Sequence, residues 1–160
     1  VKKSDTATTV NQKYDSTVLY GLEAGKYRLG VKNTKDQSVN VEYKGINQSK
    51  KAAYKKSKAI HLKSDIDSIY TSTEKAARWY KVSVSSTKKR KAVTLSKDSV
   101  GEVFKFCVYQ KGKRLKTVKV TKNDRVKTVK LPKKKGAYYV KVTKLTSKTT
   151  GAYYLGTYTY

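Results

Sequence analysis

The chain has 160 residues, with 38 Lys and Arg side chains against 11 Asp and Glu, so its formal net charge is +27. No apolar run approaches the roughly 20 residues that a membrane-spanning helix needs, so we expect no transmembrane segment. One Cys and one His exclude an internal disulfide framework and a metal cage of Cys and His ligands.

The first third of the chain already shows strand patterns. Tyr27, Leu29 and Val31 alternate with other residues, and residues 39–43 repeat this period of two, which is typical of half-buried β-strands. We interpret residues 1–49 as an N-terminal β-hairpin segment plus a linker. This segment is either the end of a preceding module or part of the same sandwich as the residues that follow.

The same alternation continues in the second module, residues 50–160. It recurs in residues 80–84 and 138–142, while residues 103–109 are apolar on both sides and predict a central strand covered on both faces. Residues 128–158 repeat the order of turns and Tyr-led strands found in residues 17–46, which supports a division into two modules. The patterns predict an all-β fold.

The second module resembles the bacterial pre-peptidase C-terminal (PPC) domains. The resemblance covers residues 58–160 and rests on an apolar opening strand at 58–62, a Trp/Tyr-led strand at 78–84, and a closing Gly-Ala-Tyr-Tyr hairpin at 131–142. It implies an antiparallel, jelly-roll-like β-sandwich that serves as an accessory module of secreted proteins. Some members of the family bind collagen or polysaccharide, and some bind calcium.

A calcium site has few ligands to draw on in this chain. Asp65, Asp67 and Glu74 form the only local acidic cluster, whereas Ca²⁺ takes six to eight oxygen ligands. We therefore expect no metal and no cofactor, with Asp65 and Asp67 as the weak candidates for a cation.

The residue types for catalysis are similarly scarce. His61 is the only histidine and has no carboxylate beside it, so every Ser-His-Asp arrangement would depend on it. Cys107 lies in the most apolar strand, where a thiol behaves as a small hydrophobe. No nucleophile-elbow or phosphate-loop motif occurs, and we expect that the chain is not an enzyme.

Tyrosine and lysine carry the clearest binding signal. Two Tyr pairs, at 138–139 and 153–154, lie in consecutive predicted strands, and neighbouring strand residues face opposite sides. If these strands form a hairpin, their outward rings make an aromatic strip beside lysines, able to stack on sugars, bases or collagen-like surfaces. The alternative is that the rings only cover a sandwich face. The predicted ligand-binding residues are Tyr139, Tyr153, Lys141, Lys133, Lys134, Lys135 and Trp79, the last facing away from the Tyr80 side of its strand.

These observations favour a non-catalytic, secreted or cell-surface bacterial module that adheres to glycan, collagen-like or anionic cell-wall polymers. A positive charge of this size attracts any polyanion. The positive side chains are mostly Lys, however, whereas sequence-specific nucleic-acid recognition prefers the planar guanidinium fork of Arg. Two alternatives stay open: a purely structural spacer in a multi-domain surface protein, and a single-stranded nucleic-acid-binding β module. The oligomeric state is not predicted.

Overall fold

The computed structural model describes residues 26, 52–63, 66–69, 76–97, 102–146, 149 and 152–160. The two strands expected within residues 1–49 and the proposed module boundary lie outside the described residues, as does the first copy of the internal repeat apart from Lys26. Among the described residues, no helix has the length and hydropathy needed to cross a bilayer.

The described chain is built almost entirely of strands, preceded by one 3-10 turn, η1 (Lys56–Lys58). The strands are β1 (Ile60–His61), β2 (Ile66–Ile69), β3 (Arg78–Val84), β4 (Lys91–Ser96), β5 (Phe104–Gln110), β6 (Lys113–Val120), β7 (Val126–Lys130), β8 (Gly136–Lys144) and β9 (Ala152–Thr159).

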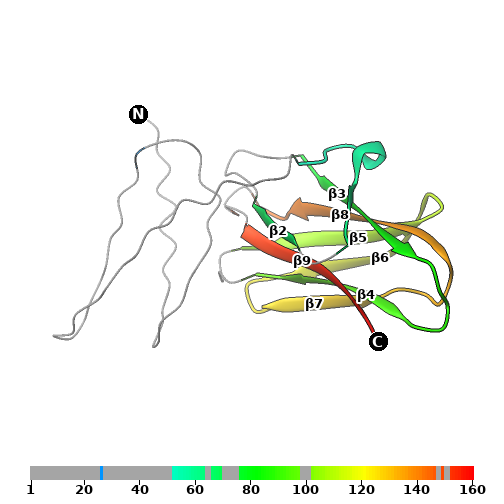
Figure 1. Ribbon diagram of the computed structural model, residues 1–160. Helices are drawn as coiled ribbons and strands as arrows, with labels where there is room; N and C mark the ends of the chain where they lie inside the picture. The colour runs from blue at the N-terminus through cyan, green and yellow to red at the C-terminus, as the bar shows by residue number, and fades with distance from the viewer. Residues whose placement is uncertain are drawn as a thin grey trace.

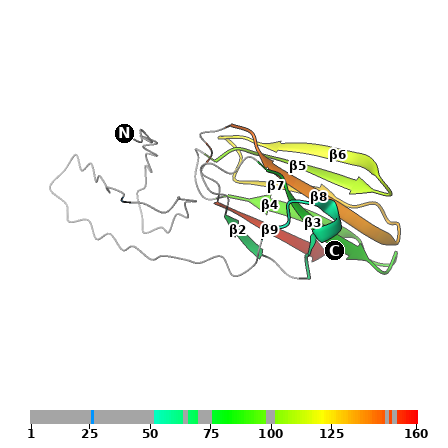
Figure 2. The ribbon, with the colours of Figure 1, turned by 90° about the horizontal axis from the view of Figure 1, so that it is seen from above.

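These strands form two sheets that pack face to face (Figures 1 and 2). One has five strands in the order β1-β3-β8-β5-β6, and the other has four in the order β2-β9-β4-β7. All pairs are antiparallel except β1 with β3, which are parallel. The predicted all-β sandwich is confirmed.

Side-chain alternation explains why the sheets pack. In β3 and β8 every second residue is buried, and the residues between are partly exposed, so each strand has one face toward the other sheet. The fully buried Tyr80, Val82, Tyr138, Val140 and Val142 all lie on this inner face. The spacing of two therefore predicted the faces of both strands correctly.

Two tyrosines connect the sheets through the core. The hydroxyl of Tyr80 in β3 is hydrogen-bonded to the hydroxyl of Tyr153 in β9, and both rings are almost completely buried. The Tyr153 ring also meets Phe104 edge to face, with the ring centroids 5.0 Å apart. These contacts make Tyr153 a core residue.

The two Tyr-rich strands do not form the hairpin that an aromatic strip shared by both would require. β8 pairs with β3 and β5, whereas β9 pairs with β2 and β4 in the other sheet. The pairs 138–139 and 153–154 therefore lie on opposite layers. The physical reason is that consecutive strands of a sandwich often cross from one sheet to the other, which alternation alone does not reveal.

The strand at 103–109 is central, as expected, but only one of its faces is covered by the second sheet. Phe104, Phe106 and Val108 point into the core, while Tyr109 on the outer side stays partly exposed. Cys107 is buried on that outer side and is hydrogen-bonded through its Sγ to the Thr117 hydroxyl, 3.4 Å away.

Candidate binding surface

Three aromatic side chains occupy the outer face of the five-stranded sheet: Trp79 of β3, Tyr139 of β8 and Tyr109 of β5. We call them the aromatic face. Trp79 is the register partner of Lys141, and Tyr139 is the partner of Tyr109, so adjacent strands bring the group together. Each ring is partly exposed, because each stands between inward-facing residues of its strand.

The rings of the aromatic face contact one another and the lysines around them. The centroids of Trp79 and Tyr109 lie 5.6 Å apart with the ring planes tilted by 44°. The Nζ of Lys141 lies 5.5 Å from the Trp79 ring centroid, and the Nζ of Lys56 lies 4.7 Å from that of Tyr139. These cation–π contacts combine apolar stacking surface with positive charge.

Burial also changes the acidity of this group. Desolvation raises the pKa of the Tyr109 hydroxyl above its ordinary value of 10.0, and the nearby Cys107 thiol adds to the rise. Tyr109 therefore remains a neutral hydrogen-bond donor at physiological pH.

At the edge of the same sheet the exposed His61 is hydrogen-bonded through its Nε2 to the Ser83 hydroxyl at 3.0 Å.

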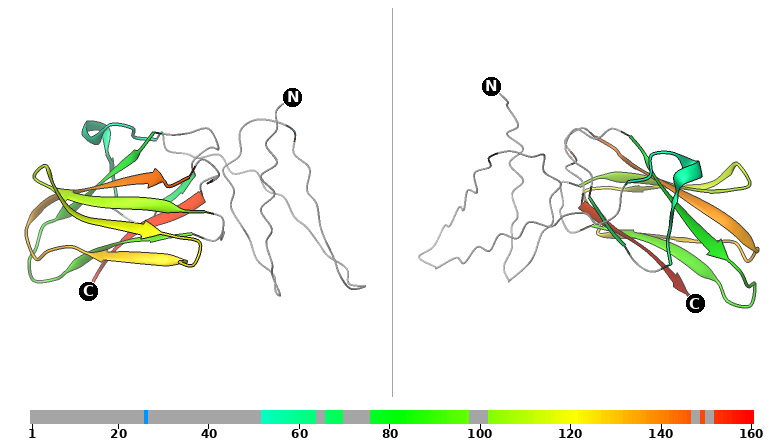
Figure 3. Two further views of the ribbon diagram at one scale, coloured as in Figure 1. Left: turned by 180° about the vertical axis from the view of Figure 1, so that it is seen from behind. Right: turned by 45° about the horizontal axis from the view of Figure 1, so that its top comes forward.

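A second feature lies at one end of the sandwich, where three connections meet: residues 85–90, 111–112 and 131–135. They appear together at the right-hand end of Figure 1 and at the left of the rear view in Figure 3. We call the exposed cations of these connections, together with Lys113 at the start of β6, the basic end. Its members are Lys88, Lys89, Arg90, Lys111, Lys113, Lys133, Lys134 and Lys135.

Strand pairing forces these connections together. Val84, the last residue of β3, pairs with Gly136, the first residue of β8, and Gln110 at the end of β5 pairs with Tyr138. The three connecting segments contain no Asp or Glu. The seven positive charges in these segments therefore have no acidic neighbour within their own segments.

Hydrogen bonds hold the backbone of the lysine-rich connection before β8, residues 131–135, in place. The hydroxyl of Tyr138 donates to the carbonyl oxygen of Lys134 at 2.9 Å, and the Lys134 amide donates to the Pro132 carbonyl at 2.7 Å. Desolvation raises the pKa of Tyr138, so this hydroxyl keeps its proton. The backbone that carries Lys133–135 is thus held in place while the side chains point into solvent.

The predicted binding residues divide into three groups. Trp79, Tyr139 and Lys141 are brought together, and Trp79 faces away from Tyr80 as expected. The lysines at 133–135 lie at the basic end instead. Tyr153 is wrong as a surface residue, because it is 1% exposed and its neighbour Tyr154 is the one that faces outward.

Sequence reasoning missed two members of this surface. Tyr109 had a usable signal, because Phe104, Phe106 and Val108 take one face of β5 and leave Tyr109 on the other. Lys56 had none, because η1 reaches the Tyr139 ring from more than eighty residues away in the chain. Such a contact becomes visible only from the tertiary structure.

The candidate cation ligands stay untested. Asp65 and the side chain of Asp67 lie outside what the structure describes. Among the described residues, no group of three or more His, Cys, Asp and Glu side chains lies together as a metal site would require. The chemistry that the described surface offers is stacking, hydrogen bonding and positive charge.

Comparisons with known proteins find similarity in structure rather than in sequence. No family profile matches the chain, and no curated protein matches its sequence. A search of solved structures finds the pre-peptidase C-terminal domain of a collagenase from Bacillus anthracis, with 16% identity and a TM-score of 0.48. The match covers 71% of this chain and 100% of that domain. The name of that relative is that of the family which residues 58–160 resemble in sequence.

Proposed function

We propose that this chain is a non-catalytic accessory module of a secreted or cell-surface bacterial protein and that it binds an anionic, glycan-bearing surface polymer. The observation that carries the proposal is the position of the basic end beside the aromatic face. Tyr109 lies two residues before Lys111, and Tyr139 lies three residues after Gly136, where the lysine-rich connection ends.

This juxtaposition suits a polymer that has both charge and sugar rings. Eight exposed cations attract anionic groups over a distance and give a salt-dependent contribution to affinity. The aromatic face adds short-range stacking on apolar sugar faces, with phenol and indole hydrogen-bond donors at its edges. A polymer lying across both regions gains from both terms.

The kind of cation narrows the ligand class further. Seven of the eight charges at the basic end are Lys and one is Arg. A Lys ammonium is a flexible point charge that accepts many anion geometries, whereas Arg provides planar, bidentate recognition. Lysine therefore favours a polymer with repeated, variably placed anionic groups over a single defined anion.

The test is a binding panel on immobilised polymers at physiological salt: a sulfated glycan, a polyol-phosphate cell-wall polymer, a collagen-like triple-helical peptide and poly-dT. We expect binding to at least one anionic surface polymer, weakened by Trp79→Ala roughly tenfold through lost stacking. Absence of binding to all four would contradict the proposal and favour a structural spacer. Preference for poly-dT over both anionic surface polymers would favour the nucleic-acid alternative.

A further inference from the structure

The outer face of the four-stranded sheet carries a shallow hollow that is separate from the aromatic face. Its volume is about 660 Å³, and it is open to solvent along one side. We call it the β9 trough. It is lined by Thr94, Ser96, Thr128, Tyr154, Leu155, Gly156, Thr157 and Tyr158.

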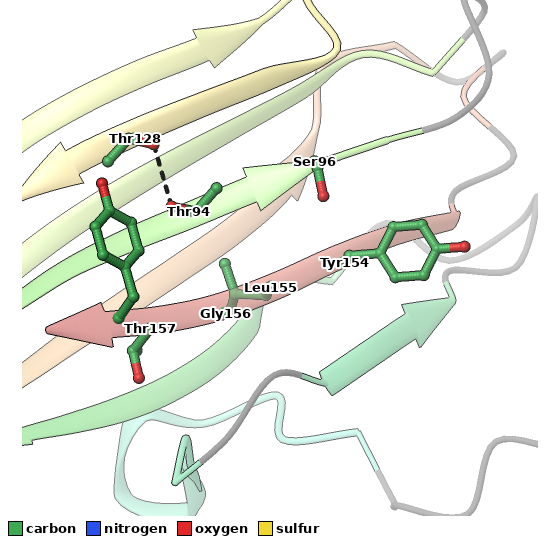
Figure 4. A pocket seen from close by; sticks show the side chains of 8 residues that line it. Thr94, Ser96, Thr128, Tyr154, Leu155, Gly156 and Thr157 are labelled. Carbon is green, nitrogen blue, oxygen red and sulfur yellow. Dashed lines mark hydrogen bonds between the residues drawn. The ribbon is translucent and has the colours of Figure 1, made fainter.

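The strand register explains why the sheet is hollowed there. Gly156 of β9 is the partner of Thr94 in β4, and Thr94 is the partner of Thr128 in β7. This row of small side chains runs across three strands, and the two threonine hydroxyls are hydrogen-bonded at 3.1 Å (Figure 4). Gly156 has no side chain to fill the floor.

Two tyrosines stand on either side of this row. Tyr154 and Tyr158 lie two residues before and after Gly156, so strand geometry puts all three on one face of β9. At about 3.3 Å per residue the two tyrosine Cα atoms are roughly 13 Å apart. Tyr158 is 47% exposed and its ring lies 5.8 Å from that of Tyr160, which extends the aromatic surface.

The chemistry of the lining differs sharply from the rest of the molecule. The chain is 31% charged, yet among the residues whose side chains the structure describes none of the eight that line the trough is charged. Threonine and serine hydroxyls both donate and accept hydrogen bonds, as sugar hydroxyls do, while tyrosine rings stack on the apolar face of a sugar. The Nζ of Lys130 lies 5.3 Å from the Tyr160 ring centroid at the rim, so an anionic ligand would find a counter-charge there but none among the eight described lining residues.

We propose that the β9 trough is a second binding site, on the layer opposite the aromatic face, and that it takes an uncharged saccharide chain. The saccharide lies across Gly156, stacks on Tyr154 and Tyr158, and exchanges hydrogen bonds with Thr94, Ser96 and Thr128. The module then holds two polymers, one on each sheet, and so joins them.

The site is tested by filling its floor. In Gly156→Thr the new side chain stands in the trough, while a β-branched residue suits a strand and adds no charge. Cellohexaose, chitohexaose and maltohexaose serve as probes, with binding followed by amide chemical-shift changes in the labelled protein. We expect one of the probes to shift the amides of β4 and β9, and Gly156→Thr to lower its affinity at least roughly tenfold.

A second variant in the trough and a control variant at the basic end show whether a loss of saccharide affinity arises from the trough itself. Tyr158→Ala truncates a ring that is half exposed, so it should fold and should weaken the same saccharide. Lys133→Gln/Lys134→Gln/Lys135→Gln should leave saccharide affinity unchanged, which separates this site from the proposed anionic-polymer site. The proposal is overturned if no probe shifts the trough amides or if the shifts lie on the aromatic face. It is also overturned if Gly156→Thr abolishes a self-association of the chain, since a second copy would then be the occupant.

Discussion

At the residue scale, the two tyrosines at 153 and 154 show how one step along a strand changes a side chain's role. Tyr153 packs on Phe104 and is hydrogen-bonded to Tyr80 inside the core, whereas Tyr154 lines the trough outside. Both are the same amino acid, so the face of the strand on which each side chain lies decides which of them stabilises the fold.

This difference predicts unequal stability effects. Tyr153→Ala should lower the free energy of unfolding by about 3–5 kcal/mol, because it leaves a cavity and removes the inter-sheet hydrogen bond. Tyr154→Ala should cost less than about 1.5 kcal/mol, because its ring is outside the core. Urea unfolding followed by Trp79 fluorescence compares the two. Equal losses would contradict the assigned orientation of β9.

The sequence contained the signal that assigns this orientation. Leu155 lies two residues after Tyr153, so the two share a face, and a strand with Leu on one side and Gly156 on the other should place Tyr153 inside. The same reasoning was sufficient for Trp79 and Tyr139. It fails to name the partner strand, because alternation fixes only which way a side chain points and not which sheet receives the strand.

At the element scale, the β5–β6 hairpin combines backbone strain with charge. Its two-residue turn is Lys111–Gly112, and both residues have positive φ, at 47° and 80°. Such turns favour Asn-Gly, because Asn tolerates the left-handed conformation better than other residues with a side chain. The Lys at this place adds a cation to the basic end at a cost in local stability.

Replacing this lysine should therefore separate stability from binding. Lys111→Asn should raise the free energy of unfolding by about 0.5–1 kcal/mol, because it relieves strain at the turn. It should also weaken binding to the anionic polymer, because one charge is lost. Thermal unfolding and a binding assay on the same preparation provide the check. A less stable variant would show that Lys111 is not strained.

The β6–β7 turn at the other end of the sandwich depends on one carboxylate. Asp124 forms an ion pair with Lys127 at 2.7 Å and accepts hydrogen bonds from the amide and the hydroxyl of Thr121 at 2.9 and 2.7 Å. The bond from Lys127, and then those from Thr121, hold the pKa of Asp124 well below its ordinary value of 3.8.

This depressed pKa predicts acid sensitivity of the turn. The stabilisation is fully present above the unfolded-state pKa of about 3.9 and is lost as the pH falls toward the lower folded-state value. Asp124→Asn should reduce stability at pH 7 and flatten its dependence on pH below about 4. Thermal unfolding of both proteins over that range tests this. An unchanged pH profile in the variant would show that other carboxylates cause the acid sensitivity.

At the scale of the whole molecule, with its net charge of +27, the order of the strands decides where cations from distant parts of the sequence gather. Residues 85–90, 111–112 and 131–135 are far apart in the sequence and meet only because β3, β8 and β5 are neighbours. A count of charges identifies the density of lysine at 111–135 but not this meeting of three connections. The all-β class was predictable from residue alternation, whereas the arrangement of the surface required the order of the strands.

Because the basic end lies at one end of the sandwich, polyanion binding at that site can be distinguished from attraction by the overall charge of the protein. If charge acts only as a general field, any three exposed cations should contribute equally to polyanion binding. If the basic end is the contact site, cations there should count for more than the same number elsewhere. Lys119, Lys122 and Arg125, exposed toward the opposite end of the sandwich, provide the matched comparison.

The most direct test compares two triple variants with equal net charge, Lys133→Gln/Lys134→Gln/Lys135→Gln and Lys119→Gln/Lys122→Gln/Arg125→Gln. Their dissociation constants for the anionic polymer bound in the panel are measured between about 50 and 200 mM salt. The basic-end variant should lose at least roughly tenfold in affinity at low salt, and its log–log salt slope should fall by about one unit for each contacting lysine. The control variant should stay near the unmodified protein. Equal losses in both variants would contradict a contact site at the basic end.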